Sequence, residues 1–311
     1  SYCGVGCQMN LLIKNNKVVD IEPLDGLANR GLLCVKGKFA YKFIDHPDRL
    51  TKPLIRKNGE LEEATWEEAI SLITDKAKEI KIESGGKAFG GLSSARCTNE
   101  ENYLFMKMMR VCFDSNSVDH CARLCHASTV AGLASTLGSG AMTNSNAEVL
   151  DSDVIFVTGS NTTETHPVIG SFMKQAKAKG AKLIVIDPRR IELAEYADVF
   201  LQILPGTNVA IFNAIMNVIL EENLQDIEYI KERTENYESF VKIIKACTPE
   251  LAATICGVEV EDIRKAARIY SSASKAGIYY AMGVTQHATG TQGVKELSAL
   301  AMLCGNIGVE S

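Results

Sequence analysis

The sequence lacks several features that would assign it to a simple class of protein. No apolar run approaches the roughly 18 residues that a membrane-spanning helix requires, and the longest, VIFVTG and LIVI, have the length of strands. No block of basic residues stands out and the formal net charge is −5, so nucleic acid is not favoured as a partner. Hydrophobic residues make up 46% and charged residues 23%, which is ordinary for a globular protein. A length of 311 residues predicts about two or three domains.

The chain also lacks the regular cysteine spacing of a disulfide framework, although it contains ten cysteines. This usage predicts a reducing, cytoplasmic location. The chain begins without a methionine, so we treat it as a possible fragment whose missing start could carry a targeting signal. Five cysteines stand alone in apolar or helical surroundings and are expected mostly in the core: Cys97, Cys112, Cys247, Cys256 and Cys304. Those that need another explanation are Cys3, Cys7, Cys34, Cys121 and Cys125.

The first part of the chain changes character near Pro53. Residues 1–50 have the pattern of short strands and turns, with a hairpin over 10–24 around an Asn-Asn pair. Beyond them, Thr65 and Glu68 form a capping box that predicts a helix over 66–83. A strand over 87–94 and a helix over 99–112 should follow. Residues 53–120 are therefore expected to be the first part of an α/β domain, too short to close a sheet.

Strand and helix patterns alternate regularly in residues 121–311. Continuous apolar strands are expected at 153–159, 182–189, 197–203 and 277–284, and helices at 166–180, 208–223 and 293–306. Three shorter helices should cover about 226–273. The alternation predicts a mostly parallel, doubly wound, Rossmann-like sheet, so that the fold class is α/β. Such sheets bind ligands at the carboxyl ends of their strands.

Three cysteines near the start have a spacing that points to metal chemistry. Cys3 and Cys7 are separated by three residues that include two glycines, and Cys34 is followed by Lys36. With a fourth thiolate, which would fall just upstream of Ser1 if separated from Cys3 by two residues, this order would hold a 4Fe-4S cluster. Zinc is the competing ligand, and three unrelated buried cysteines are the remaining alternative.

The stretches YCGVGC and GLLCVKG resemble the N-terminal cluster domain of the molybdopterin-guanine-dinucleotide oxidoreductases. The family includes formate dehydrogenases and nitrate reductases, and the resemblance extends over essentially the whole chain. It implies a small β-rich 4Fe-4S domain at residues 1–52, with Cys3, Cys7 and Cys34 as cluster ligands, followed by α/β domains. It also implies that Lys36 lies between the cluster and the pterin and assists electron transfer. From the residues alone, Lys36 reads as a surface lysine.

The pair Cys125–His126 stands at the start of a helical pattern. A thiolate there is favoured by the helix N-terminus and can act as a nucleophile or a soft metal ligand. The adjacent histidine can move a proton near neutral pH. Part of a zinc site that includes Cys121, or simply a buried helix start, remain alternatives on the residues alone.

The segment CARLCHASTVAGL resembles the active-site segment of formate dehydrogenases. There the cysteine (or selenocysteine) binds molybdenum or tungsten and a histidine follows it, whereas nitrate reductases commonly have methionine at that second position. The resemblance therefore implies that Cys125 is the metal ligand and that His126 accepts or relays the proton of formate. Cys121 has no role in the family and is expected to be structural.

Polar residues follow the predicted strands in three loops, TGSNTTETHP, IDPRR and LPGTN. Each could place N–H groups or a guanidinium against a phosphate, but none is a GxGxxG or P-loop motif, and ordinary turns are the default. Their succession resembles the guanine-dinucleotide site of the same family. It implies contacts to the pyrophosphate from Gly159 and Asn161, to the guanosine end from Asp187 and Arg189, to the same region from Gly206 and Asn208, and to the pterin from Met282, Gly283 and Gln286.

Taken together, the resemblance implies the catalytic subunit of a formate dehydrogenase. It would oxidise formate to CO₂ reversibly at a molybdenum or tungsten bis(molybdopterin guanine dinucleotide) centre, with electrons leaving through the 4Fe-4S cluster to an iron–sulfur or flavin subunit. The alternatives are a nitrate reductase, a formylmethanofuran dehydrogenase subunit, or a non-catalytic iron–sulfur scaffold. Family members are about twice as long, and the arginine that orients formate in them would lie just beyond the end of this chain. Residues 121–311 would be the guanine-dinucleotide-binding domain.

Overall fold

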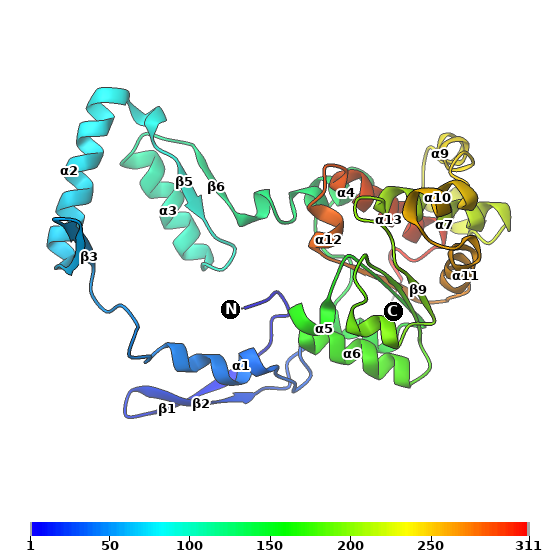
Figure 1. Ribbon diagram of the computed structural model, residues 1–311, viewed down its shortest axis with the longest axis horizontal. Coiled ribbons are helices and arrows are strands. Elements are labelled where there is room, and N and C mark those ends of the chain that lie inside the picture. Colours follow the sequence, from blue (N-terminus) through cyan, green and yellow to red (C-terminus); the bar gives the residue numbers. More distant parts are fainter. Residues whose placement is uncertain (1, 310–311) are drawn as a thin grey trace. The chain divides into compact units, whose positions relative to one another are not determined.

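The computed structural model describes residues 2–309, which divide into two compact units (Figure 1). The first unit contains residue 2 and residues 11–21 and 36–123. The second contains residues 3–10, 22–35 and 124–309. Each unit is described by itself. Within residues 2–309, no helix combines the length and the apolar character needed to cross a bilayer.

The predicted hairpin is confirmed. Strands β1 (Met9–Lys14) and β2 (Lys17–Pro23) pair around Asn15 and Asn16, whose φ angles of 51° and 58° suit the tight turn of a two-residue hairpin. The expectation of short strands and turns up to residue 50 is wrong for its last part, where helix α1 (Val35–Phe39) and a 3₁₀ turn (Ala40–Phe43) follow. Lys38 on this helix binds the Asp20 carboxylate at 2.7 Å, a tertiary contact that stabilises the short helix.

The rest of the first unit consists of two separate pairs of strands and two longer helices. Strands β3 (Leu54–Lys57) and β4 (Glu60–Glu63) form one antiparallel pair, and β5 (Gly91–Ser93) and β6 (Val118–His120) one parallel pair. The predicted helices are confirmed as α2 (Trp66–Ser84), which begins with the expected capping box, and α3 (Asn99–Val111). A short 3₁₀ turn spans Gly86–Ala88.

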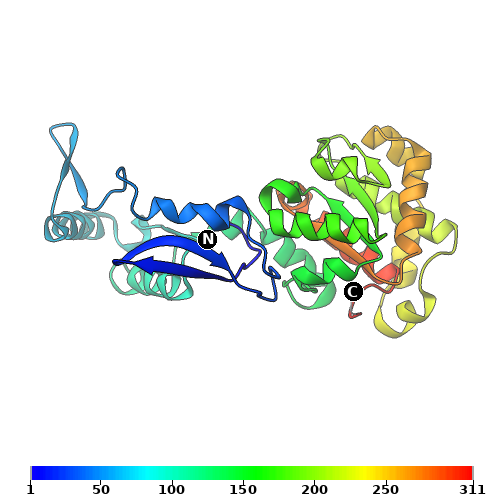
Figure 2. The same ribbon diagram turned by 90° about the horizontal axis from the view of Figure 1, so that it is seen from below.

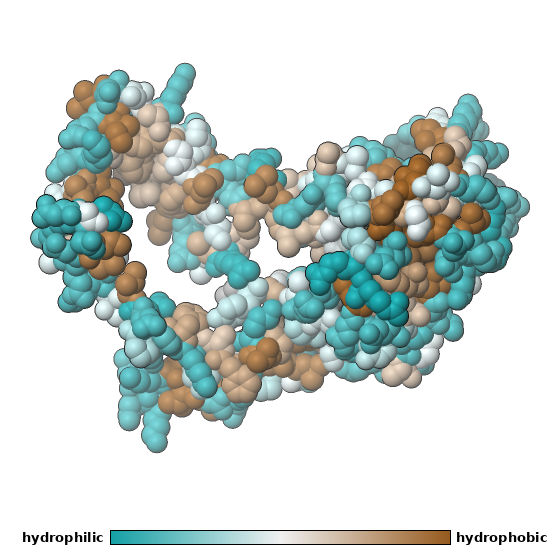
Figure 3. All heavy atoms as spheres, viewed as in Figure 1, coloured by the Kyte–Doolittle hydropathy of each residue, from teal (hydrophilic) through white to brown (hydrophobic). Residues whose placement is uncertain are grey.

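Helix α2 has no buried side chain in the described structure. Most of its large apolar residues are exposed, Ile82 by 88%, and Figure 3 shows apolar side chains at the surface around α2 and α3. Exposed apolar faces of this kind are unusual for a finished domain. This exposure agrees with the expectation that residues 53–120 are only part of a domain, which stays a prediction.

The second unit contains a fully parallel four-stranded sheet in the order β10-β7-β8-β9, as predicted (Figures 1 and 2). The strands are β7 (Val154–Thr158), β8 (Lys182–Ile186), β9 (Val199–Leu201) and β10 (Ala276–Tyr280). Because strand side chains alternate, Ile155 and Val157 pack with Phe172 on one face, whereas Phe156 and Ile184 belong to the core on the other face. Helices cover both faces, so the sheet is doubly wound.

The helices of the second unit follow the predicted pattern with two corrections. Four helices, not three, cover residues 226–273, because Asn236 (φ 61°), Thr248 with Pro249 at the first helical position, and Gly257 (φ 72°) each interrupt the helical pattern. The strand expected to reach residue 284 ends at Tyr280 and turns into a short helix, α12. The helices are α4 (Ala127–Leu137), α5 (Thr162–Thr165), α6 (Pro167–Ala178), α7 (Asn208–Glu221), α8 (Ile227–Arg233), α9 (Tyr237–Ile244), α10 (Pro249–Cys256), α11 (Val260–Ser271), α12 (Met282–Thr285) and α13 (Gly290–Leu303), with 3₁₀ turns at Cys121–Arg123, Asn146–Asp151 and Glu192–Glu195.

The isolated cysteines are less buried than the sequence suggested. Only Cys256 is fully buried, and Cys247 and Cys304 are partly exposed. Cys97 and Cys112 are exposed, because they flank α3 in the thin first unit, where little packs over them. The expectation of a core position is therefore wrong for these two residues.

The strand order places a topological switch point between β7 and β10. The chain runs outward from β7 through β8 to β9 and then returns to the other side of β7 as β10. In parallel sheets a crevice for ligands opens at the carboxyl ends of the strands at such a point. The loops after β7 and β10 meet there.

Candidate cofactor site

The three N-terminal cysteines all lie in the second unit and are partly exposed. Burial raises the pKa of the Cys7 thiol, and the nearby Cys3 and Cys34 raise that pKa further. The Cys7 thiol thus interacts electrostatically with each of the other two. Gly6, at φ 77°, makes the turn between Cys3 and Cys7. Within residues 2–309, no three His, Cys, Asp or Glu side chains gather closely enough to hold a single metal ion.

Two asparagines hold the cysteine loops in place. Asn29 is completely buried; its amide donates to the carbonyl oxygens of Leu24 at 3.0 Å and Leu32 at 2.9 Å, and its oxygen accepts from the Gln8 N–H at 3.1 Å. Asn146 donates to the carbonyl oxygen of Val5, between Cys3 and Cys7, at 2.9 Å. Neither residue can be recognised from the sequence, because bridging by a side-chain amide depends on tertiary contacts that leave no local pattern.

Lys36 belongs to the first unit, on helix α1, and is partly exposed. It follows Cys34 by two residues along the chain. Its predicted role in electron transfer stays a prediction.

Cys125 and His126 lie at the start of a helix, as the sequence predicted. His126 occupies the cap position of α4, and Cys125 directly precedes it and is partly exposed. The carbonyl oxygen of Cys125 accepts a hydrogen bond from the Thr285 hydroxyl at 2.7 Å, and that of Leu124 accepts one from the Gln286 amide at 2.8 Å. Segments about 160 residues apart along the chain are thus joined at this pair.

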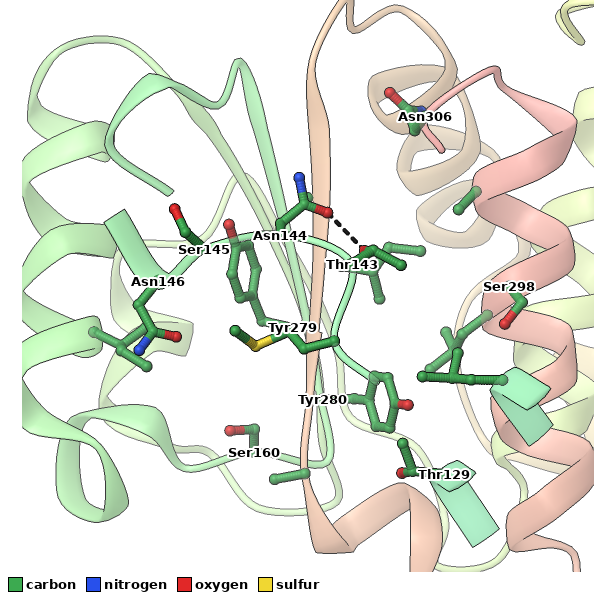
Figure 4. A pocket seen from close by; sticks show the side chains of 18 of the residues that line it. Thr129, Thr143, Asn144, Ser145, Asn146, Ser160, Tyr279, Tyr280, Ser298 and Asn306 are labelled. Carbon is green, nitrogen blue, oxygen red and sulfur yellow. Dashed lines mark hydrogen bonds between the residues drawn. The ribbon is translucent and has the colours of Figure 1, made fainter. Parts of the chain in front are cut away.

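The His126 ring is half-buried beside a cavity. Its Nδ1 lies 3.0 Å from the Thr129 hydroxyl, and burial lowers the pKa of the imidazole. Burial raises the pKa of Tyr280, and the neighbouring Thr129 hydroxyl lowers that pKa to a smaller extent. All three residues line a cavity of about 390 Å³ beside β10. Figure 4 shows Thr129 and Tyr280 next to each other at one end of it.

Three predicted residues from three different loops converge at the switch point. Gly159, with φ 56°, follows β7, and its carbonyl oxygen accepts the N–H of Gly283 at 3.0 Å. Asn208, at the start of α7, is buried and donates its amide to the carbonyl oxygen of Gly283 at 3.1 Å. A Cβ atom on Gly283 would lie 2.6 Å from Gly159, so neither position has room for a side chain. No side chain of Gly159 or Gly283 therefore covers the backbone where these loops meet.

The other predicted residues surround this point less closely. Asp187 is buried at the end of β8, where burial raises its pKa, and its carboxylate accepts the Arg189 N–H at 2.8 Å. Gly206, at φ 88°, occupies the turn between β9 and α7, which the Thr207 N–H closes onto the Leu204 carbonyl at 3.3 Å. Asn161 caps the short helix α5. Arg189, Met282 and Gln286 are exposed.

Comparison with known proteins identifies relatives of the whole chain. The family model for molybdopterin oxidoreductase matches residues 49–311, and that for the molybdopterin oxidoreductase Fe4S4 domain matches residues 1–46. The chain is 51% identical over 310 residues to the F420-dependent formate dehydrogenase subunit alpha of Methanocaldococcus jannaschii, covering 99% of this chain and 45% of that protein. It is 41% identical over 314 residues to formate dehydrogenase H of Escherichia coli, covering 99% and 44%.

A solved structure shares the fold. Acetylene hydratase from Pelobacter acetylenicus superposes with a TM-score of 0.84 at 24% identity, covering 99% of this chain and 43% of that one. The chain therefore spans less than half the length of the relatives that it matches. The Fe4S4 match over residues 1–46 favours a cluster over zinc for the N-terminal cysteines.

Proposed function

The chain belongs to the molybdopterin oxidoreductase family, and on that premise we propose that it is part of the catalytic subunit of a formate dehydrogenase, which converts formate to CO₂ reversibly. The observation that carries the proposal is the Cys125–His126 pair at the start of α4, held against α12 by the hydrogen bond from Thr285. The names of the relatives at 41% and 51% identity support formate as the substrate.

The residues fit the cofactors of this family. Cys7, which interacts with both Cys3 and Cys34, would join them in supplying thiolates for a 4Fe-4S cluster, with Lys36 proposed to assist electron transfer. The bare backbone at Gly159 and Gly283 allows the close approach that a pyrophosphate needs. Cys125 would bind the molybdenum or tungsten of the bis(molybdopterin guanine dinucleotide). When bound, this centre accepts two electrons from formate and passes them on singly.

The remaining loop residues are proposed to position the dinucleotide. Asn161 and Gly159 would contact its pyrophosphate, and Asp187 and Arg189 its guanosine end. Gly206 and Asn208 complete the second loop, and Met282, Gly283 and Gln286 face the pterin. The buried carboxyl of Asp187 is an acceptor suited to the N–H groups of a guanine base.

His126 is proposed to take up the proton of formate. The Thr129 hydroxyl occupies the hydrogen-bonding position at Nδ1, so Nε2 is the atom proposed to accept the proton. Burial of the imidazole lowers its pKa and so favours the neutral ring that can act as a base. Thr129 also fixes the orientation of the ring.

The subunit is proposed to pass electrons to an iron–sulfur or flavin partner in the cytoplasm. None of the ten cysteines forms a disulfide in the described structure, which supports a reducing compartment. The name of the Methanocaldococcus jannaschii relative suggests F420 as one final acceptor to test. We further propose residues 1–52 as the cluster domain, 53–120 as part of an α/β domain completed by other segments, and 121–311 as the dinucleotide-binding domain.

The proposal is tested in the full-length protein with Cys125→Ser and, as a matched control, Cys121→Ser. Wild type and the control should oxidise formate with a dye acceptor, and Cys125→Ser should lose this activity. Nitrate and formylmethanofuran are assayed in parallel. Turnover of either of these without formate turnover, or full activity of Cys125→Ser, would contradict the assignment.

A further inference from the structure

Thr285 is a buried polar residue that the family resemblance did not assign. Its side chain is 3% exposed, and it ends the short helix α12. The hydroxyl donates to the carbonyl oxygen of Cys125 at 2.7 Å. A buried hydroxyl with a short, directed bond to the backbone of a proposed metal ligand points to a role in placing that ligand.

Thr285 is bonded to the Cys125 segment from both sides. Its own carbonyl oxygen accepts the hydroxyl of Ser128 at 3.0 Å, three residues after Cys125. These two hydrogen bonds, between Thr285 and residues 125 and 128, form what we call the Thr285 bracket. Because the bracket spans the first turn of α4, it fixes the position of Cys125 both along the helix axis and around it.

The bracket has little freedom to shift. A Cβ atom on Gly290, the first residue of α13, would lie 2.2 Å from the Thr285 carbonyl oxygen and 2.9 Å from the Ser128 hydroxyl. The backbone of α13 therefore closes tightly over it. Thr285 is also β-branched, which restricts its χ1 angle and holds the hydroxyl in one direction.

Helix α12, which contains Thr285, also contacts the loops proposed to bind the dinucleotide. Gly283, two residues before Thr285, is bonded to Gly159 at 3.0 Å and to Asn208 at 3.1 Å. Four residues of α12 thus connect the loops after β7 and β9 with the Cys125 segment. The position of a metal bound by Cys125 relative to a cofactor held by those loops would therefore be set by the single turn of α12.

We propose that Thr285 is a positioning residue that sets the place of the Cys125 thiolate relative to the dinucleotide-binding loops. The proposal rests on the proposed function only in taking Cys125 as the metal ligand. Thr285 acts through Cys125 and is not proposed to contact the substrate.

The test compares Thr285→Val, which keeps the shape but loses the donor, with Thr285→Ser, which keeps the donor. Thr254→Val is the matched control, because Thr254 is exposed and its hydroxyl bonds a carbonyl within its own helix at 3.1 Å. The full-length, cofactor-loaded proteins are compared by the electron paramagnetic resonance spectrum of the half-reduced molybdenum or tungsten and by kcat and KM for formate.

Thr285→Val should shift the g-values and lower kcat by about fivefold, the factor that corresponds to loss of one ordinary hydrogen bond, while KM changes less. Thr285→Ser and Thr254→Val should keep the wild-type spectrum. If Thr285→Val does not accumulate, Ser128→Ala opens the other side of the bracket and should also shift the spectrum.

An unchanged spectrum in Thr285→Val overturns the proposal. If that variant does not accumulate, an unchanged spectrum in Ser128→Ala overturns it. A Thr285→Ser spectrum identical to that of Thr285→Val also overturns it, because the hydroxyl would then not be the cause. If the wild-type protein holds the metal but does not oxidise formate, the proposed function fails, while the spectral comparison still tests Thr285.

Discussion

The backbone N–H of Gly283 donates to the carbonyl oxygen of Gly159 at 3.0 Å, so the turns after strands β10 and β7 lie directly against each other. These strands are neighbours in the sheet but are separated along the chain by β8, β9 and the seven α-helices from α5 to α11. The contact is possible only because both residues lack a side chain. It marks the switch point of the sheet, where the bare backbone is available to a ligand.

The first prediction follows from this contact. In Gly283→Ala the new Cβ would lie 2.6 Å from the Cα and carbonyl oxygen of Gly159, and a backbone cannot yield as a flexible side chain does. We expect the free energy of unfolding of the full-length protein to fall by about 1–3 kcal/mol. Bound pterin, measured after extraction, should fall as well.

Gly90→Ala is the matched control for this variant. A Cβ atom there would meet its nearest neighbour, the Ser117 carbonyl oxygen, at 4.0 Å, which is ordinary contact. Equal stability and equal pterin content in the two variants would show that the loops at Gly159 and Gly283 separate easily, contrary to the structure.

The second prediction concerns Asn208, which bonds the Gly283 carbonyl at 3.1 Å from the start of α7. Asn208→Ala removes a donor from a buried position, and such a loss costs about 1–3 kcal/mol. Denaturant unfolding of the full-length protein should detect this difference. The exposed Asn10→Ala variant should unfold like wild type, and an Asn208→Ala curve that overlays it would rule out a structural contribution from the bond.

Much of the fold could be predicted because its signals are local. The buried strands β7 and β8 are continuous apolar runs, and the capping box of Thr65 and Glu68 marks the start of α2. The start of α4 at Cys125–His126 was also predicted. Such patterns depend on neighbours within a few residues, so a single sequence contains them.

Other features depend on contacts between distant segments, and the sequence did not reveal them. Helix α12 interrupts the expected strand because Thr285 and Gly283 bond to segments far along the chain. Thr285 and Asn29 carry no motif, since a buried hydroxyl or amide becomes informative only when its partner is known. The exposure of Cys97 likewise depends on how little covers the first unit.

The third prediction is a pH dependence of stability caused by Glu296. This carboxyl is 8% exposed on α13, and its burial raises its pKa. The folded state therefore binds the proton more tightly than the unfolded state does. The protein is stabilised below the ordinary pKa of glutamate, and this contribution is lost as the pH rises through the raised pKa of the folded state.

Glu296→Gln should therefore be more stable than wild type at about pH 8 and differ little at about pH 4. Urea unfolding of the full-length proteins across this range measures the difference. Glu232→Gln, at an exposed position, is the control and should follow wild type at each pH. A Glu296→Gln variant that is less stable at the alkaline end would mean that the hydrogen bond from the Gln292 amide to the carboxylate outweighs the cost of burying its charge.

The last prediction orders the reactivity of the cysteines outside the proposed cluster. Burial, together with nearby Asp226, raises the pKa of Cys304 to about 12, and burial also raises that of Cys256. Because the thiolate is the nucleophile, only about one part in ten thousand of Cys304 would be reactive near pH 8. Cys97 and Cys121 are exposed and should react far sooner.

Brief treatment of the full-length protein with iodoacetamide, followed by peptide mass spectrometry, tests this order. Cys97 and Cys121 should be labelled in the native protein, whereas Cys256 and Cys304 should require denaturant. Labelling of Cys304 as fast as Cys97 would mean that α13 opens readily. Since α13 closes over the Thr285 bracket through Gly290, such opening would also loosen the hold on Cys125, so slow labelling of Cys304 reports on the rigidity of the proposed metal site.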